Sequence, residues 1–193
     1  ESLISSEEVV VTLTNTGYIK RVPLNSYRSQ RRGGKGRAGM TTKEEDYVNK
    51  VFVVNTLTPL LFFSSMGIVY KLKTYKIPSG SPTSKGKALV NILPLRSGEK
   101  ITATMPYDQS DEKNNIIFAT SSGNIRRNRL TDFHNINANG KIAMKLKEED
   151  KLINVIICSE KENIFMSTRL GKCVRFGCND LRIFSGRSSI GVR

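Results

Sequence analysis

The chain has 193 residues, with 31 lysines and arginines against 17 acidic residues, and so a formal net charge of +14. A hydrophobic content of 38% is enough for a core and excludes disorder of the whole chain. No apolar run reaches the roughly 18 residues of a membrane-spanning helix, and the acidic start does not resemble a signal peptide. The charge favours a polyanionic partner, above all nucleic acid, although a basic surface that serves only solubility is a second interpretation.

Four segments of similar pattern follow one another along the chain. Each has an apolar stretch, a polar turn that contains Gly, and a second stretch that carries cations. The segments are VVVTLTNTGYIKRVPL (9–24), PLLFFSSMGIVYKLKTYKI (59–77), NIIFATSSGNIRRNRLTDF (115–133) and NIFMSTRLGKCVRFGCNDL (163–181). Short runs of β-branched and aromatic residues predict strands, and a glycine at the turn suits a tight hairpin. We therefore predict that each repeat opens with a β-hairpin.

A second glycine recurs 17 to 20 residues after each turn glycine. The turn glycines are Gly17, Gly67, Gly123 and Gly171, and the second glycines are Gly36, Gly86, Gly140 and Gly191. An apolar stretch, an acidic turn and a further strand then follow, the strands being 48–56, 100–107 and 151–158. About four strands in about 50 residues are typical of a propeller-like array. We predict an all-β fold of about four antiparallel, four-stranded blades, approximately 5–58, 59–110, 111–160 and, in part, 161–193.

Residues 30–36 read QRRGGKG and expand the loop around the second glycine of the first repeat. The segment is not a P-loop, because the four-residue spacer and the Lys-Ser/Thr ending of that motif are absent. We predict a loop that joins the first blade to its neighbour. Its glycines allow close backbone approach, and its cations face the phosphates of a duplex. Whether its main task is contact with nucleic acid or closure of a ring of blades stays open.

Cations recur at similar places in the repeats, and a propeller would bring equivalent positions to one rim that contacts phosphates. The second strand of the first repeat carries Lys20 and Arg21 in this pattern. The candidate contacts are Gln30, Arg31, Arg32, Gly33, Gly34, Lys35 and Gly36, and additionally Arg37, Lys71, Lys73, Lys85, Lys87, Arg126, Arg127, Arg129, Lys141, Lys172 and Arg175. Exposed strands are also often rich in Lys and Arg because charge blocks edge pairing, and this interpretation stays open for any single cation.

Little in the sequence favours catalysis or a metal centre. His134 is the one histidine; a general base needs positioned partners, so we expect a surface or hydrogen-bonded residue, with a basic hydrolase as a competing hypothesis. The acidic triplets at 44–46 and 148–150 recur at one place in two repeats, which favours a structural turn over a metal site. The three cysteines are irregularly spaced and predict neither a disulfide framework nor a zinc site, in keeping with a reducing cytoplasm.

The heptad Gln30–Gly36, inside a β repeat of about 50 residues, resembles at every position the signature box of the C-terminal domain of bacterial DNA gyrase A. The segments EEDYVNKVFVVNT, FSSMGIVYKLKTYKIP and GKALVNILPL also resemble the first two blades of that family. The resemblance covers essentially the whole chain. The related domain of topoisomerase IV lacks an intact box. Family members usually have six blades, so we expect a fragment of about four blades from a longer chain.

The resemblance implies a β-pinwheel, in which neighbouring blades exchange strands, with double-stranded DNA bent around a basic rim. It also implies a non-catalytic domain without a cofactor of its own, in a cytoplasmic, bacterial, nucleoid-associated topoisomerase. That enzyme would assemble as an A2B2 heterotetramer of gyrase A and gyrase B proteins, use ATP and Mg elsewhere, and introduce negative supercoils. The alternatives are a propeller that binds an acidic protein partner and the topoisomerase IV domain.

Overall fold

The computed structural model describes residues 3–27 and 46–193. These residues form antiparallel sheets, and their helices are single 3-10 turns of three or four residues, none long and apolar enough to span a membrane. The turns are η1 (Leu24–Ser26), η2 (Thr74–Lys76), η3 (Leu89–Asn91), η4 (Leu130–Phe133) and η5 (Cys178–Asp180). The chain divides into two compact units, residues 1–61 with 71–98, and residues 62–70 with 99–193.

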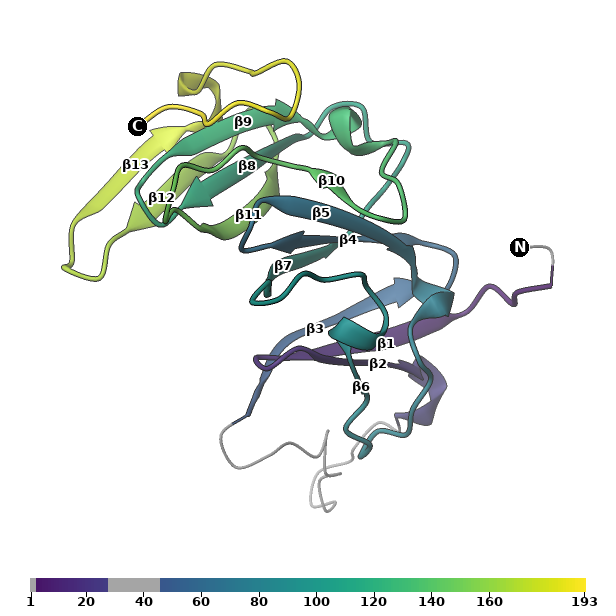
Figure 1. The fold of residues 1–193 in the computed structure, drawn as a ribbon. Helices are drawn as coiled ribbons and strands as arrows, with labels where there is room; N and C mark the ends of the chain where they lie inside the picture. Colours follow the sequence, from purple (N-terminus) through teal and green to yellow (C-terminus); the bar gives the residue numbers. More distant parts are fainter. Residues whose placement is uncertain (1–2, 28–45) are drawn as a thin grey trace, which may run out of the picture. The chain divides into compact units, whose positions relative to one another are not determined.

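The first sheet lies in the first unit and has the strand order β3–β1–β2–β6 (Figure 1). Its strands are β1 (Glu8–Thr14), β2 (Tyr18–Pro23), β3 (Val48–Asn55) and β6 (Lys87–Ala88). After Glu8, every residue of β1 is buried, which is why this run of Val, Thr and Leu forms a central strand. Strand β6 belongs to the second repeat in sequence, yet it pairs with β2 of the first, with Lys87 opposite Ile19.

The second sheet has the order β10–β5–β4–β7. Its strands are β4 (Pro59–Ser64), β5 (Ile68–Lys73), β7 (Ile101–Pro106) and β10 (Lys141–Ile142). All six residues of β4 are buried. Here too the short strand comes from the following repeat, because Lys141 of β10 pairs with Val69 of β5.

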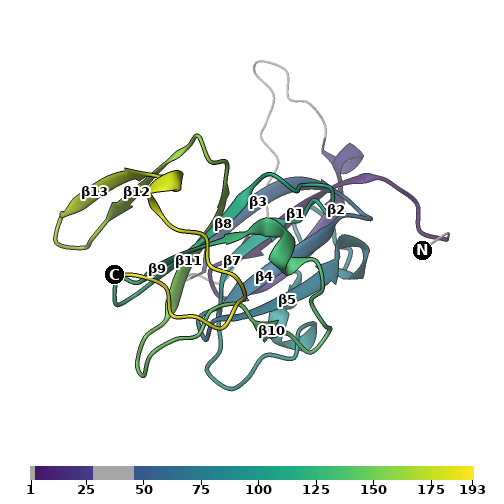
Figure 2. The ribbon, with the colours of Figure 1, turned by 90° about the horizontal axis from the view of Figure 1, so that it is seen from above.

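The remaining sheets lie in the second unit, in the orders β11–β8–β9 and β12–β13. Their strands are β8 (Asn115–Thr120), β9 (Ile125–Arg129), β11 (Leu152–Cys158), β12 (Asn163–Ser167) and β13 (Cys173–Gly177). The end of the chain runs beside β9 in both ribbon views (Figures 1 and 2), where Val192 forms an antiparallel bridge with Ile125. Ile164 and Phe176 of the β12–β13 hairpin pack in the same apolar cluster as Ile117 and Ile125.

The prediction of an all-β pinwheel is confirmed, including a hairpin at the start of each repeat. The strand exchange that the resemblance implied is also present, because the residue after the second glycine pairs with the preceding repeat in three cases. Each of the first two sheets has four strands. The third sheet has three, since the exchanged segment forms only isolated bridges there, and the fourth has two among the described residues.

Two of the second glycines, Gly86 and Gly191, are required by this exchange. Gly86 has φ +83, and an added Cβ would lie 2.5 Å from the carbonyl oxygen of Ile19. Gly191 has φ +90 and repeats the geometry, with 2.4 Å to the carbonyl oxygen of Ile125. Since that oxygen belongs to the backbone of the neighbouring strand, it cannot swing aside, and any side chain would push the exchanged strand away.

We expect Gly86→Ala to lower the free energy of unfolding by about 3 kcal/mol, because left-handed strain of about 1 kcal/mol is combined with a backbone clash. Gly98→Ala is the matched control: Gly98 has φ +76 with open space around its Cβ position, so only the strain applies. Denaturant unfolding of both variants measures the difference. Equal losses of stability in the two variants would show that the close approach of the Ile19 carbonyl oxygen does not require glycine at position 86.

Candidate nucleic-acid interface

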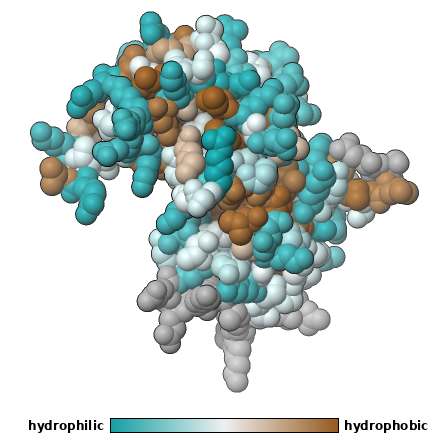
Figure 3. Space-filling model, in the orientation of Figure 1, coloured by the Kyte–Doolittle hydropathy of each residue, from teal (hydrophilic) through white to brown (hydrophobic). Residues whose placement is uncertain are grey.

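The candidate contacts of the first loop, Gln30–Gly36 and Arg37, lie outside the described residues. Among the others, the structure distinguishes three groups by exposure. Lys87, Arg129, Lys172 and Arg175 are exposed, whereas Lys71, Lys73, Lys85 and Lys141 are half-buried. Arg126 and Arg127 form the third group and are buried. Hydrophilic side chains cover much of the β12–β13 hairpin, which carries two of the exposed cations (Figure 3).

The half-buried lysines are held by nearby groups. The Lys85 ammonium lies 4.0 Å from the centre of the Tyr18 ring, a cation–π contact. Lys141 donates from Nζ to the carbonyl of Asn135 at 2.6 Å, and Lys73 to the carbonyl of Leu57 at 3.2 Å. Partial burial, and then the charge of Lys73, lowers the pKa of Lys71. These cations are therefore engaged with neighbouring groups of the fold.

The expectation that Arg126 and Arg127 are exposed is wrong, because their exposed fractions are 0% and 3%. Arg126 donates from Nη1 to the carbonyls of Arg187 and Ser189, at 2.8 and 2.7 Å, and from Nη2 to the carbonyl of Ala143. Desolvation lowers the pKa of Arg126 to about 10, so the guanidinium stays charged at neutral pH.

The neighbouring Arg127 is held in a similar way. It donates from Nη1 to the carbonyls of Cys178 and Leu181, at 3.1 and 3.0 Å, and from Nη2 to Glu160 at 2.8 Å. Four of the acceptors of the two arginines, the carbonyls of Arg187, Ser189, Cys178 and Leu181, belong to the backbone of the following repeat. Both side chains therefore fasten the next segment of chain to β9.

Lys20 and Arg21 in the first repeat also donate hydrogen bonds to backbone carbonyls of the following repeat. Lys20, only 1% exposed, donates from Nζ to the carbonyls of Ser81, Pro82 and Ser84 at 3.0, 2.6 and 2.8 Å. Burial lowers the pKa of Lys20. Arg21 donates from Nε to the carbonyl of Ile77 at 2.8 Å. The sequence pattern that grouped Lys20 with exposed cations was wrong in this respect.

The two pairs share one register, and we call them the interrepeat clamps: Lys20 with Arg21, and Arg126 with Arg127. Each pair stands three and four residues after a turn glycine. The first cation of each pair donates to the carbonyls that lie four and two residues before the second glycine of the following repeat. The other cation donates to the carbonyl that lies ten residues after the turn glycine of the following repeat. Sequence reasoning missed the clamps, although adjacent cations at a fixed distance from the turn glycine were a signal.

The second repeat has a different pair in this register, Tyr70 and Lys71. Tyr70 is 2% exposed and donates its hydroxyl hydrogen to Glu99, whose two carboxylate oxygens lie 3.0 and 2.9 Å away. Glu99 belongs to the acidic turn of the same repeat. In the second repeat, a tyrosine hydroxyl and a carboxylate thus occupy the position at which the first and third repeats have a buried cation and backbone carbonyls.

The acidic triplet at 148–150 forms a structural turn, as predicted, and of the triplet at 44–46 only Asp46 lies among the described residues. Asp46 accepts from the backbone N–H and hydroxyl of Thr16 at 3.0 and 2.5 Å. Asp150 accepts from the hydroxyls of Ser121 and Ser122, at 2.8 and 2.7 Å, and from the Ser122 N–H at 2.9 Å. Burial opposes ionisation of both carboxyls, but these hydrogen bonds outweigh it and lower each pKa. Each carboxylate therefore ties the acidic turn to the hairpin turn of its own repeat.

His134 is hydrogen bonded, one of the two states predicted for it: its Nδ1 contacts the Tyr107 hydroxyl, and the two rings meet edge to face. Burial first, and then Asp111 and Asp108, raise the pKa of Tyr107 to about 12. The described residues contain no group of three or more His, Cys, Asp or Glu side chains placed to hold a metal ion.

Comparison with known proteins gives the family of this chain. Residues 8–55, 58–108, 114–159 and 162–193 match the family described as DNA gyrase C-terminal domain, beta-propeller. The chain belongs to the DNA gyrase C-terminal domain family. It is 54% identical to a DNA gyrase A protein of Rickettsia conorii, 48% to that of Granulibacter bethesdensis and 43% to that of Haemophilus influenzae. All of this chain is covered in each comparison, but only 22%, 21% and 22% of those relatives.

Solved structures give the same fold. A DNA gyrase A C-terminal domain is 27% identical, with a TM-score of 0.70 over 96% of this chain and 59% of that one. A C-terminal domain of DNA topoisomerase IV superposes with a TM-score of 0.83 over 99% of this chain and 58% of that one, at 23% identity, which speaks to the fold alone. The resemblance to the gyrase C-terminal domain family is confirmed.

We expect Lys20→Met to lower the free energy of unfolding by about 2–4 kcal/mol, because three backbone carbonyls lose their charged donor. Denaturant unfolding measures the loss. Hydrogen exchange at Lys87 should also rise, since the segment that leads into β6 then loses the three hydrogen bonds from Lys20. Lys50→Met, at an exposed position of β3, is the matched control and should change stability little. A Lys20→Met protein as stable as the control would refute the clamp in this gyrase-family domain.

We expect Asp150→Asn to cost about 1–2 kcal/mol at pH 7, because hydrogen bonds to a charged acceptor are lost. The folded pKa of Asp150 lies below that of an unfolded aspartate, about 3.9. Its contribution is therefore complete above that pH and is lost as the pH falls through the folded pKa. The stability difference between the native protein and Asp150→Asn should narrow below about pH 4. Glu148→Gln, which neutralises an exposed carboxylate two residues away, is the control; a difference that is constant from pH 7 to pH 2 would contradict this account.

Proposed function

We propose that this domain binds double-stranded DNA and bends it, as the DNA-wrapping part of a gyrase-type topoisomerase. The observation that carries the proposal is the match of four successive repeats to the gyrase C-terminal domain family. The net charge of +14 supports it, because an excess of this size favours a polyanion. The blade ranges 5–58, 59–110, 111–160 and 161–193 belong to the same proposal.

The exposed cations determine how such a domain would hold DNA. Lys87, Arg129, Lys172 and Arg175 come from three of the repeats and are exposed to solvent. Contacts with phosphates position a duplex without reading its sequence, so binding would be tolerant of sequence and sensitive to salt. Bending a stiff duplex costs on the order of several kcal/mol, and contacts from several repeats would offset that cost. Arg126 and Arg127 leave this set, because both are engaged in a clamp.

The proposal assigns the chemistry to other parts of the relatives' length. DNA cleavage, ATP and Mg would belong to the remainder of the gyrase A protein and to gyrase B, in an A2B2 assembly in the bacterial cytoplasm. This domain would contribute only the surface around which the DNA is bent. The box Gln30–Gly36 and Arg37 would contact DNA or join the first blade to its neighbour, and wrapping with positive handedness would depend on it.

We expect the intact polypeptide that contains this chain to change the linking number of nicked circular DNA that is ligated in its presence, in the positive direction. Replacement of Arg31, Arg32 and Lys35 by alanine should remove most of the change in linking number, because the box would no longer hold the DNA that runs past it. Gel electrophoresis of the ligated topoisomers measures the shift.

The control variant replaces Lys50, Lys100 and Lys147 by alanine, an equal loss of charge at positions outside the candidate set. It should retain the shift. DNA that is bound without any change of linking number would argue against wrapping, and a box variant that behaves like the control would remove the role given to the box.

A further inference from the structure

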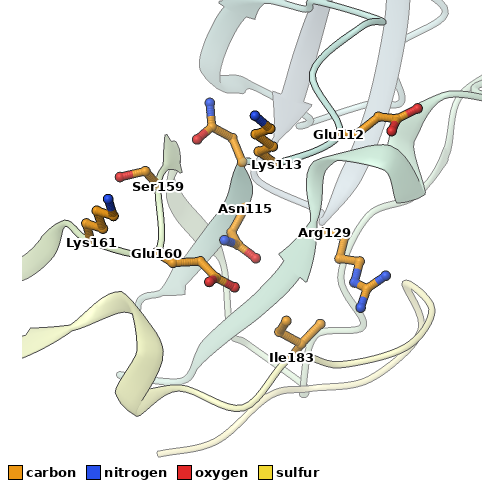
Figure 4. Close-up of a pocket in the computed structure, with 9 residues that line it drawn as sticks. Glu112, Lys113, Asn115, Arg129, Ser159, Glu160, Lys161 and Ile183 are labelled. Atoms are coloured by element: carbon orange, nitrogen blue, oxygen red, sulfur yellow. The ribbon is translucent and has the colours of Figure 1, made fainter.

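A surface cavity of about 580 Å³ lies in the second unit, beside the first residue of β8 (Figure 4). One wall is formed by the chain that leads into β8 and by the end of β9, and the other by the loop after β11 and by Ile183. The lining residues are Glu112, Lys113, Asn114, Asn115, Arg129, Ser159, Glu160, Lys161 and Ile183. The volume falls in the range of small-ligand sites.

Asn115 is one of the residues that line this cavity, and the NH2 end of its side-chain amide has no partner. The residue is 2% exposed. Its Oδ1 accepts from Nε of Arg127 at 3.1 Å, and this contact orients the amide, so that Nδ2 is the remaining donor. Nδ2 has no hydrogen-bond partner in the structure. A buried donor without an acceptor costs about 1–3 kcal/mol, so this position favours a ligand that brings an acceptor atom.

The other lining groups are mostly donors as well. Within the described part of the chain, the side chains of Lys113, Arg129 and Lys161 make no hydrogen bond or ion pair, and the Ser159 hydroxyl is also without a partner. Glu160 is paired with Arg127 at 2.8 Å. The carboxylate of Glu112 points away from Asn115 in the close-up (Figure 4). The cavity therefore offers three cations and two neutral donors against a single unpaired carboxylate at its edge.

We propose that this cavity is an oxyanion site for a phosphate group, with Nδ2 of Asn115 as the fixed inner donor and Arg129, Lys113 and Lys161 around it. Phosphate presents several acceptor oxygens and negative charge, which match this set of donors. The lining contains no aromatic side chain on which a base could stack, and Ile183 is its one aliphatic residue. The ligand is therefore a phosphodiester of a nucleic-acid backbone. This choice of source rests on the proposed function, whereas the oxyanion site does not.

Lysine footprinting in the intact polypeptide tests the site. Acylation rates of Lys113 and Lys161 are measured by mass spectrometry with inorganic phosphate, with a 40-base-pair duplex, and with chloride at equal ionic strength. We expect acylation of both lysines to slow by about tenfold when phosphate is at ten times its dissociation constant. Lys147, outside the cavity, should not change. The duplex should protect the same two lysines.

Two variants examine the donors. Asn115→Asp keeps an acceptor for Arg127 and nearly the same volume, but replaces the Nδ2 donor by an anionic oxygen; Arg129→Gln removes the charge beside it. Both should abolish protection, and Arg129→Gln should reduce the slope of log affinity against log salt by about 1. Arg169→Gln, in the turn at the far end of the β12–β13 hairpin, is the matched control.

The outcomes separate this proposal from the proposed function. Failure of phosphate and duplex to protect either lysine overturns the oxyanion site, even where the duplex is retained by other parts of the protein. Protection that persists in Asn115→Asp overturns it as well. Protection by phosphate together with no duplex binding supports the oxyanion site, overturns its assignment to nucleic acid and contradicts the proposed function.

Discussion

The interrepeat clamps are the interaction that fixes two of the three strand exchanges seen in the described residues. A lysine or arginine on the second strand of a hairpin reaches backbone carbonyls of the following repeat and is itself almost fully buried. Burying a charge is costly unless its donors are satisfied, and removing one partner leaves the other with the full desolvation cost. The hairpin and the next repeat therefore need each other, which makes the strand exchange of β6 and of Val192 a fixed feature.

The clamps change how the charge of this protein should be understood. A net charge of +14 suggests a surface covered with cations. The four clamp cations instead hold backbone carbonyls of the following repeat, and three of the four are buried. Among the described residues, cations exposed to solvent lie on the hairpins, on the exchanged strand β6 and beside the cavity at Asn115. Two kinds of cation, one structural and one available for phosphates, thus occur within the same strand: β9 carries buried Arg126 and exposed Arg129.

Sequence reasoning succeeded where the signal is local. A glycine that closes a hairpin, a run of β-branched residues and an acidic turn each follow from the conformations of a few neighbouring residues, and they recur at fixed spacing. It failed for Arg126 and Arg127, because alternation along a strand does not say that a neighbouring segment covers the outer face. It also could not find the Asn115 cavity, whose walls come from four separate segments, residues 112–115, 129, 159–161 and 183.

The number of repeats, their all-β character, the positions of their hairpins and the family to which they belong can all be read from the sequence, because each is written in short, periodic patterns. Contacts between distant segments set the rest: which cations are buried, why Gly86 and Gly191 must lack a side chain, and where a donor is left without an acceptor. Burial and hydrogen bonding depend on which segment pairs with each strand, and no local pattern names that segment. Here it comes from the next repeat.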